Sequence, residues 1–267
     1  MRGTSPAFAG SIPDAYDRYL RPLLFDPFAI DLATRLPMLP GMNVLELACG
    51  TGILTRALLG MLPGDATIVA TDLSEQMLAV AQQQVSPDER LAWQPADAMA
   101  LPFDADSFDV VVCQFGMMFF PDKPAVLGEI RRVLKAGGTL LFNVWDSMQR
   151  NEIALITHQT LARAYATNPP TFLDTPYGFF DVDVIAALVR DAGFWDIRVD
   201  RVDLDGHSPS ARDAARGFVA GTPIATDLAE AGEPAEPGID AVATALAARF
   251  GRGELTVRLS ALVVEAR

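Results

Sequence analysis

Short apolar runs alternate with segments of helical period between residues 41 and 145. Asn43–Cys49 is a short apolar run bounded by Gly41 and Gly50, which is typical of a buried strand. Four more strands are predicted at Thr67–Thr71, Leu91–Gln94, Phe108–Gln114 and Thr139–Trp145. Strands that alternate with helices pair in parallel through right-handed crossovers, so this pattern predicts a doubly wound α/β sheet.

Helices are predicted between these strands, where apolar residues recur at helical spacing. The first covers Ile53–Leu62. The second begins after Ser74, a residue type that caps helices, and runs to about Val85. The third covers Asp122 to Leu134, with Gly137 expected just past its end.

The chain outside this region is less regular. Helical period marks five further segments, at Ile12–Leu36, Asn151–Tyr165, Val182–Ala192, Ser210–Val219 and Ile239–Phe250. Strands are expected at Ile197–Leu204 and Thr256–Glu265. Glu230–Gly238, rich in Ala, Glu, Pro and Gly, is expected to be a mobile loop. The sheet is therefore interrupted twice, after its fifth strand and between its sixth and its last.

Charge and cysteine content narrow the class of protein. The 267 residues include 21 Lys and Arg against 34 Asp and Glu, a net charge of −13, which disfavours nucleic acid as a partner. Two cysteines, Cys49 and Cys113, are too few for a disulfide scaffold or a zinc ribbon, and no metal is expected. The longest apolar stretch, Val110–Phe120, is too short to span a bilayer, and the N-terminal segment lacks a signal-peptide run. We predict a cytoplasmic protein, either a monomer or a homodimer.

The most informative stretch is the glycine-containing loop after the first strand. Gly50 and Gly52 lie between that strand and a helix that follows at once. Glycines permit positive φ and a close approach of ligand to backbone, and the helix N-terminus offers free N–H groups. In open α/β sheets ligands bind at the carboxyl ends of the strands, where this loop lies. The alternative interpretation is a plain tight turn.

Two acidic residues follow at the same predicted edge. Asp72 ends the second strand, about twenty residues after the loop, where an acid accepts hydrogen bonds from ribose hydroxyls. Asp97 follows the third strand and is placed to accept a hydrogen bond from an adenine amino group. The alternatives are a helix-flanking acid for Asp72 and an Asx turn or cap for Asp97.

Two kinds of nucleotide ligand fit this pattern. A dinucleotide fingerprint needs Gly or Ala at the position that Thr55 occupies here. Glu46, just before the loop, would repel a pyrophosphate but suits a ligand that carries an ammonium and a sulfonium. The pattern therefore favours a sulfonium ligand over a dinucleotide.

The ordered set of motifs resembles that of class I S-adenosylmethionine-dependent methyltransferases. The resemblance covers about residues 41–145 and lies closest to the small-molecule subgroup that includes the ubiquinone/menaquinone-biosynthesis methyltransferases. The motifs that carry it are Glu46–Thr55, Asp72, Asp97-Ala98 with Leu101-Pro102-Phe103, Ser107-Phe108-Asp109 and Glu129–Gly138. It implies a Rossmann-like, seven-stranded, mostly parallel sheet whose last strand runs antiparallel between the fifth and the sixth, with helical insertions that form a cap.

The resemblance also implies which residues hold the methyl donor, S-adenosyl-L-methionine, and its product, S-adenosyl-L-homocysteine. The loop residues Ala48, Gly50 and Gly52 would hold the methionine part, with Glu46 nearby. Asp72 would bind the ribose. The remaining expected donor contacts are Leu73 and Met77 beside the adenine, Asp97 and Ala98 at its edge, and Gln114 beside the amino-acid tail. Ala48 departs from the glycine that many members have there.

The acceptor side is less defined. Methyl transfer is an in-line displacement, so positioning can supply much of the rate, and a polar acceptor also needs a general base. The core motifs contain no such base, and the candidates are His158, Tyr19 and Tyr16, with His207 less favoured because it precedes an apparent helix cap. An apolar acceptor pocket is predicted from Phe115, Met118, Phe119 and Tyr177, although core packing explains part of this run equally well.

On this basis we expect four segments. They are an N-terminal helical lid over residues 1–40, a donor-binding core over 41–145, an insertion that contributes to the acceptor pocket over 146–192, and C-terminal core strands over 193–267 with a helical insertion at about 205–255. The predicted function is transfer of a methyl group to O, N or C of a small, partly apolar acceptor. The alternatives are an NAD-dependent oxidoreductase and a methyltransferase-like binding module without catalysis.

Overall fold

The computed structural model describes residues 12–267, which form two compact units. Unit 1 contains the described residues up to Pro27, residues 146–178 and residues 203–260. Unit 2 contains residues 28–145, 179–202 and 261–267. Each unit thus joins stretches that lie far apart in the sequence.

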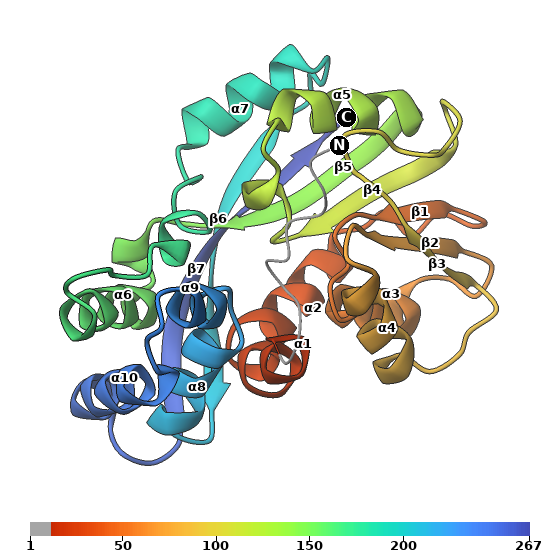
Figure 1. Ribbon diagram of the computed structural model, residues 1–267. Coiled ribbons are helices and arrows are strands. Elements are labelled where there is room, and N and C mark those ends of the chain that lie inside the picture. The colour runs from red at the N-terminus through yellow and green to blue at the C-terminus, as the bar shows by residue number, and fades with distance from the viewer. Residues whose placement is uncertain (1–11) are drawn as a thin grey trace. The chain divides into compact units, whose positions relative to one another are not determined.

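The strands form one seven-stranded sheet, in the order β3-β2-β1-β4-β5-β7-β6 (Figure 1). Their bounds are β1 (Asn43–Glu46), β2 (Thr67–Asp72), β3 (Leu91–Pro95), β4 (Phe108–Gln114), β5 (Leu134–Trp145), β6 (Arg198–Ser208) and β7 (Leu255–Ala266). β1 to β5 pair in parallel, and β7 pairs antiparallel with β5. The predicted fold class, with its last strand between the fifth and the sixth, is confirmed.

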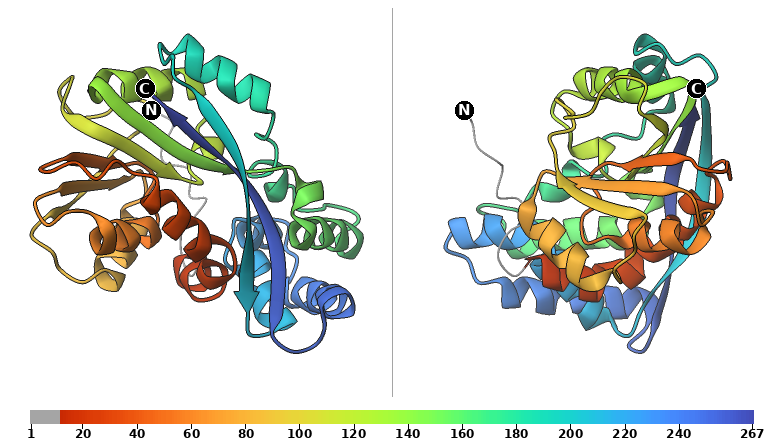
Figure 2. Two further views of the ribbon diagram at one scale, coloured as in Figure 1. Left: turned by 180° about the vertical axis from the view of Figure 1, so that it is seen from behind. Right: turned by 90° about the vertical axis from the view of Figure 1, so that its right-hand side faces the viewer.

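Both long C-terminal strands pass from one unit into the other. β6 leaves unit 2 after Val202, and β7 enters it at Ala261. Both views in Figure 2 show these two strands side by side.

Unit 2 carries the parallel part of the sheet, covered by helices on both faces. α3 (Ile53–Met61) and α4 (Glu75–Gln84) cover one face, and α5 (Lys123–Val133) and α7 (Val182–Asp191) cover the other (Figure 1). This layering explains why Val44 and Leu45 of β1 are both fully buried, although neighbouring residues of a strand point to opposite faces. Most of α2 (Asp26–Thr34) and the short 3₁₀-helix η2 (Met117–Phe119) also belong to this unit.

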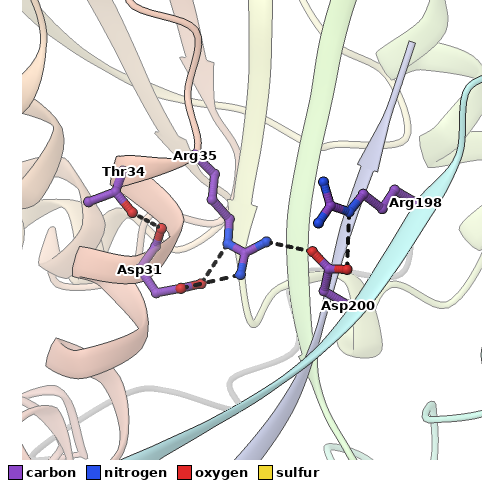
Figure 3. A network of polar contacts seen from close by, with 5 residues as sticks. All are labelled: Asp31, Thr34, Arg35, Arg198 and Asp200. Carbon is purple, nitrogen blue, oxygen red and sulfur yellow. Dashed lines mark hydrogen bonds and ion pairs between the residues drawn. The ribbon is translucent and has the colours of Figure 1, made fainter.

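A network of charged side chains joins the end of α2 to β6 within unit 2 (Figure 3). Arg35 donates hydrogen bonds from Nε to Oδ2 of Asp31, at 2.9 Å, and from Nη1 to Oδ2 of Asp200, at 3.0 Å. Arg198 lies on the other side of Asp200, with Nε 3.1 Å from Oδ1. A segment that precedes β1 is thereby attached to the edge strand β6.

Unit 1 is mainly helical. It contains α1 (Ile12–Ala15), the π-helix η1 (Tyr16–Phe25), η3 (Met148–Arg150), α6 (Glu152–Ala164), η4 (Phe172–Asp174), α8 (Ala211–Ala220), α9 (Ile224–Glu230) and α10 (Ala235–Phe250). α10 contacts both α6 and α8, and α8 contacts η1. Gly217 permits the last contact, since a Cβ atom there would lie 2.7 Å from Cδ2 of Leu20. The described residues up to Pro27, most of the first interruption of the sheet and the second interruption therefore share this unit.

The structure corrects two local predictions. Gly137 does not follow α5: the chain becomes extended directly at Leu134, and Gly137 lies inside β5 with φ +74°, near an irregular register between Phe108 and Val110. Glu230–Gly238 is not all loop, because α10 begins at Ala235. The hydroxyl of Tyr165 fixes this start by donating to the Pro234 carbonyl and accepting from the Gly238 N–H.

Candidate methyl-donor site

The loop after β1 contains three residues with left-handed backbone, Ala48, Gly50 and Gly52, with φ of +51°, +56° and +79°. The two glycines serve different purposes. A Cβ atom at Gly50 would have open space around it, with nothing within 4 Å. A Cβ atom at Gly52 would lie 2.8 Å from Cγ2 of Val85. Gly50 therefore leaves the backbone accessible to a ligand, whereas Gly52 is required for packing.

Asp72 at the end of β2 is attached to this loop. Its Oδ2 accepts a hydrogen bond from the Gly50 N–H at 2.9 Å, and its Oδ1 accepts one from the Ser74 N–H at 2.8 Å. Burial raises the pKa of Asp72, and these two N–H groups counteract part of the rise. The neighbouring side chain, Leu73, is 52% exposed. A carboxylate with remaining acceptor capacity thus lies next to an accessible apolar side chain, the pair that a ribose and an adenine require.

Glu46 at the end of β1 is buried, with 1% of its surface exposed. Its Oε2 accepts a 2.7 Å hydrogen bond from the Thr55 hydroxyl in α3. Burial raises the pKa of Glu46 to about 8, although the hydrogen bonds from Thr55 act in the opposite direction. Burial therefore favours the protonated form of Glu46, and its contact with the ammonium of a ligand stays a prediction.

The segment after β3 brings Asp97 and Ala98 to the same edge of the sheet. The Ala96 N–H donates to the Asp72 carbonyl at 3.0 Å, which joins this segment to the end of β2. Oδ1 of Asp97 accepts from the Met99 N–H at 2.9 Å, so the Asx turn that the sequence left open is present. That bond uses one oxygen of Asp97, and the role of the other at an adenine amino group stays a prediction.

Two residues of α5 hold the continuation of this segment. Arg132 donates to the carbonyls of Leu101 and Phe103, at 2.9 and 2.6 Å, and Oε2 of Glu129 accepts from the Leu101 N–H at 2.8 Å. Arg132 also pairs with Glu129 at 2.7 Å, which lowers the pKa of that carboxyl. These contacts give a structural reason for finding Leu101–Phe103 and Glu129–Arg132 together in the motif series.

The strand register places four polar residues on one face of the sheet. Glu46 pairs with Val112, and Gln114, two residues further along β4, pairs with Asn143 of β5. Asp72 lies two residues beyond Ala70, the partner of Glu46 in β2. Because alternate residues of a strand share a face, all four belong to the same face at its carboxyl edge. Asn143 is not among the residues predicted above, although the sequence contains a signal for it, an amide within the otherwise apolar run Thr139–Trp145.

The residues after β4 are largely core. Phe115 is buried, its ring stacked on Trp145 at 3.9 Å and edge-on to Phe28 at 5.5 Å. Met118 is buried too, whereas Phe119 is partly exposed. Packing accounts for the buried part of this run, and the acceptor contacts of Phe115, Met118 and Phe119 stay predictions. Among the expected donor contacts, Met77 is buried in the first turn of α4 and Gln114 is half-buried.

The remaining candidates belong to unit 1. Tyr16 stacks on Phe25 at 4.7 Å, the Tyr19 ring lies under the Arg18 guanidinium, and Nε2 of His158 lies 3.8 Å from Oδ1 of Asp174. Tyr177 is buried, which raises its pKa. Their roles in catalysis and acceptor binding stay predictions.

His207 lies near the end of β6, three residues before the helix cap that the sequence predicts. It is exposed, with Nδ1 3.2 Å from the Thr256 hydroxyl. The cap of α8 is Ser210, whose Oγ accepts from the Asp213 N–H.

The groups present fit an adenosyl sulfonium. The backbone at Gly50 has open space around it, the Asp72 carboxylate accepts the hydrogen bond from the Gly50 N–H, and Leu73 next to Asp72 is exposed. Glu46 at the base of the loop offers no positive charge to a pyrophosphate. Across residues 12–267, no cluster of three His, Cys, Asp or Glu side chains could hold a metal ion. Within the same range, no helix has the length and apolar character to cross a membrane.

Comparison with known proteins agrees with this geometry. Residues 44–138 match the model of the family described as "Methyltransferase domain". A demethylmenaquinone methyltransferase of Clavibacter sepedonicus is 42% identical over 101 residues, 38% of this chain and 40% of that protein. The ubiquinone/menaquinone biosynthesis C-methyltransferase UbiE of Paracoccus denitrificans is 30% identical over 167 residues, 58% of this chain and 66% of that protein. The chain thus spans less than two thirds of either relative.

Among solved structures, phosphoethanolamine N-methyltransferase 2 of Haemonchus contortus, in complex with S-adenosyl-L-methionine, superposes with a TM-score of 0.60. The likeness covers 95% of this chain and 56% of that one at 20% sequence identity, and it establishes the shared fold. The family match lies on the part of unit 2 that holds the glycine loop, Asp72 and Asp97. Residues 44–138 thus match a methyltransferase domain, and this part of the chain is similar to the demethylmenaquinone and ubiquinone/menaquinone-biosynthesis methyltransferases.

Proposed function

We propose that this protein transfers a methyl group from S-adenosyl-L-methionine to a small-molecule acceptor. The observation that carries the proposal is the hydrogen bond between Asp72 and the glycine loop, in which the carboxylate accepts from the Gly50 N–H. Open space surrounds Gly50, and Leu73, next to Asp72, is exposed. When bound, the donor supplies an electrophilic methyl group on a sulfonium. The relatives named as methyltransferases support the same activity.

We assign the donor-side roles as follows. Asp72 accepts the ribose hydroxyls, Leu73 packs on the adenine, and the Asp97–Ala98 segment reads the adenine edge. The backbone of the loop at Gly50 holds the amino-acid part, with Glu46, Ala48, Gly52 and Gln114 around it. Burial of Glu46 supports a neutral role for this side chain, as a hydrogen-bonding group at the base of the loop.

The acceptor is a small molecule of partly apolar or planar character. Phe119 supports this assignment, because it is a large apolar side chain that stays 36% exposed at the end of η2, the short helix that follows β4. Its neighbour Lys123 donates to the carbonyls of Met118 and Phe120, and its ammonium lies 4.8 Å from the centre of the Phe179 ring. An apolar segment that is held in this way presents a shaped surface to an acceptor.

Donor binding is tested by calorimetry with S-adenosyl-L-homocysteine and, separately, with NAD. Binding of the first compound and not of the second is expected. Binding of NAD alone would contradict the proposal in favour of an oxidoreductase. Asp72→Asn keeps the size of the side chain and removes its charge. This matched variant is expected to bind S-adenosyl-L-homocysteine more weakly than the wild-type protein does.

Turnover is tested with S-adenosyl-L-methionine labelled in its methyl group and pooled phenols, amines and quinols as acceptors. Label transferred to any small molecule by the wild-type protein, and lost in Asp72→Asn, supports an enzyme. Tight donor binding without transfer to any member of a broad pool would favour the non-catalytic binding module. The cytoplasmic location and the choice between monomer and homodimer stay predictions.

A further inference from the structure

Asn143 is a fully buried amide near the C-terminal end of β5, between apolar neighbours. Its Oδ1 atom accepts a hydrogen bond from the backbone N–H of Phe115 at 2.9 Å. The same N–H lies 3.2 Å from the backbone carbonyl oxygen of Asn143. Two acceptors of one residue thus converge on one donor at the end of β4.

Phe115 needs such support because its backbone is left-handed, with φ +51°. This backbone conformation is unfavourable for a bulky residue, and it persists only where the surrounding structure imposes it. Here the hydrogen bond from Asn143 and the stacking of the Phe115 ring on Trp145 impose it together.

The turn at Phe115 brings the next residue, Gly116, against the donor loop. A Cβ atom at Gly116 would lie 2.7 Å from the Cβ atom of Ala48 and 2.6 Å from Sγ of Cys113. Ala48 is itself left-handed, with φ +51°, and lies two residues before Gly50. The shape of the glycine loop therefore depends on where the Phe115–Gly116 turn lies.

The nitrogen of the Asn143 amide indicates why an asparagine, and not an apolar residue, occupies this position. Nδ2 of Asn143 is shielded from solvent and has no hydrogen-bond partner among residues 12–267. Burial of an unpaired N–H group is costly, and leucine, of similar size, would avoid it. Because Nδ2 is shielded, a ligand cannot contact it in this conformation.

We propose that Asn143 is a positioning residue of the donor site. Its Oδ1 atom holds Phe115 in the left-handed conformation, and Phe115 in turn places Gly116 beneath Ala48 of the loop that binds the donor. This inference rests on the proposed function, since it concerns the same donor site.

The test compares Asn143→Leu and Asn143→Asp by calorimetry with S-adenosyl-L-homocysteine. Leucine removes the acceptor, and we expect the Kd to rise at least about tenfold, which corresponds to about 1.4 kcal/mol. A buried aspartic acid is protonated, so its carbonyl oxygen still accepts the Phe115 N–H, and a Kd within about threefold of wild type is expected. Thr157→Val, which removes a buried hydroxyl bonded to the Ile153 carbonyl in α6, is the matched control and should leave the Kd unchanged.

A spectroscopic readout separates positioning from stability. Loss of the left-handed turn should alter the stacked Phe115–Trp145 pair, so the near-ultraviolet circular dichroism of Asn143→Leu should differ from wild type well below its Tm, while that of Asn143→Asp should not. If Asn143→Leu bound S-adenosyl-L-homocysteine like wild type, the inference would be wrong while the proposed function stood. Loss of affinity in both variants would also contradict the inference, because the Oδ1 atom would then not be what matters. Absence of binding by the wild type would overturn the proposed function, and the inference with it.

Discussion

The hydroxyl of Thr55 in α3 donates a 2.7 Å hydrogen bond to Oε2 of Glu46 at the end of β1, and both side chains are buried. Thr55 occupies the position at which a dinucleotide site has a small residue for close helix packing. In this chain the larger side chain uses its hydroxyl to donate a hydrogen bond to a buried carboxyl group. The pair therefore fixes the first turn of α3 relative to the strand that precedes the donor loop.

This pair predicts a pH-dependent stability. Glu46 titrates at about 8 in the native state and near 4.3 when unfolded, so between these values the native protein binds more protons than the unfolded chain. The free energy of unfolding should therefore decrease as pH rises from about 5 to 8, by a few kcal/mol at most. Asp72, whose pKa is also raised by burial, acts in the same direction.

Urea denaturation of wild type and Glu46→Gln at pH 5.5 and 8 measures this effect. The glutamine variant keeps an oxygen that accepts from Thr55 and does not titrate, so its stability should depend less on pH than that of wild type. Equal pH dependence in the two proteins would contradict a buried, protonated Glu46.

Substitution of Asp72 should weaken donor binding. Asp72→Ala removes the acceptor of the Gly50 N–H as well as the expected acceptor of the ribose hydroxyls. Charge-assisted hydrogen bonds contribute about 1.5–3 kcal/mol, so the Kd for S-adenosyl-L-homocysteine should rise at least about tenfold. Calorimetry on the folded variant, with folding checked by circular dichroism, measures it, and an unchanged Kd would remove Asp72 from the donor site.

The two glycines of the loop should respond differently to alanine. Gly50→Ala meets no neighbouring atom, and its left-handed backbone costs about 1 kcal/mol, so the main effect should be weaker binding of S-adenosyl-L-homocysteine. Gly52→Ala places a Cβ atom 2.8 Å from Val85 and 3.3 Å from Ala81, so it should lose about 2–4 kcal/mol of stability from crowding and strain together.

Each glycine variant is the control for the other. Thermal unfolding and calorimetry on both proteins give the two quantities. If Gly50→Ala lost more stability than Gly52→Ala, or bound the donor product like wild type, the assignment of ligand access to Gly50 would be wrong.

The Arg35 network predicts a salt-sensitive attachment of α2. Arg35→Met keeps most of the aliphatic stem and removes the hydrogen bonds to Asp31 and Asp200. The side chains of all three residues are less than a third exposed. A loss of about 1–2 kcal/mol at low ionic strength is expected, and a smaller loss at 1 M salt. Arg35→Lys, which retains the charge without the two-pronged geometry, should fall between wild type and methionine. A loss that does not change with salt would point to packing of the stem instead.

Part of this site follows from local pattern alone. Three features depend only on near neighbours in the chain: the apolar run before Gly50, the β-branched run before Asp72 and the capping position of Ser74. The sequence therefore predicts the strands, the starts of the helices and the acidic residue that follows the loop. The alternation of strand and helix likewise predicts parallel pairing through right-handed crossovers. The antiparallel β7 between β5 and β6 is implied only by the resemblance to class I methyltransferases.

The tertiary structure decided what depends on neighbours distant in sequence. Gly52 is needed because Val85, thirty-three positions later, occupies the space of its Cβ atom, and Glu46 retains its proton because folding removes it from water. Asn143 meets the Phe115 N–H only when β4 and β5 pair, and the N-terminal segment joins both interruptions of the sheet only through packing of η1, α8, α10 and α6. Residue type and spacing set the elements of this protein, whereas burial and long-range contact set the protonation, the backbone strain and the positions of its functional groups.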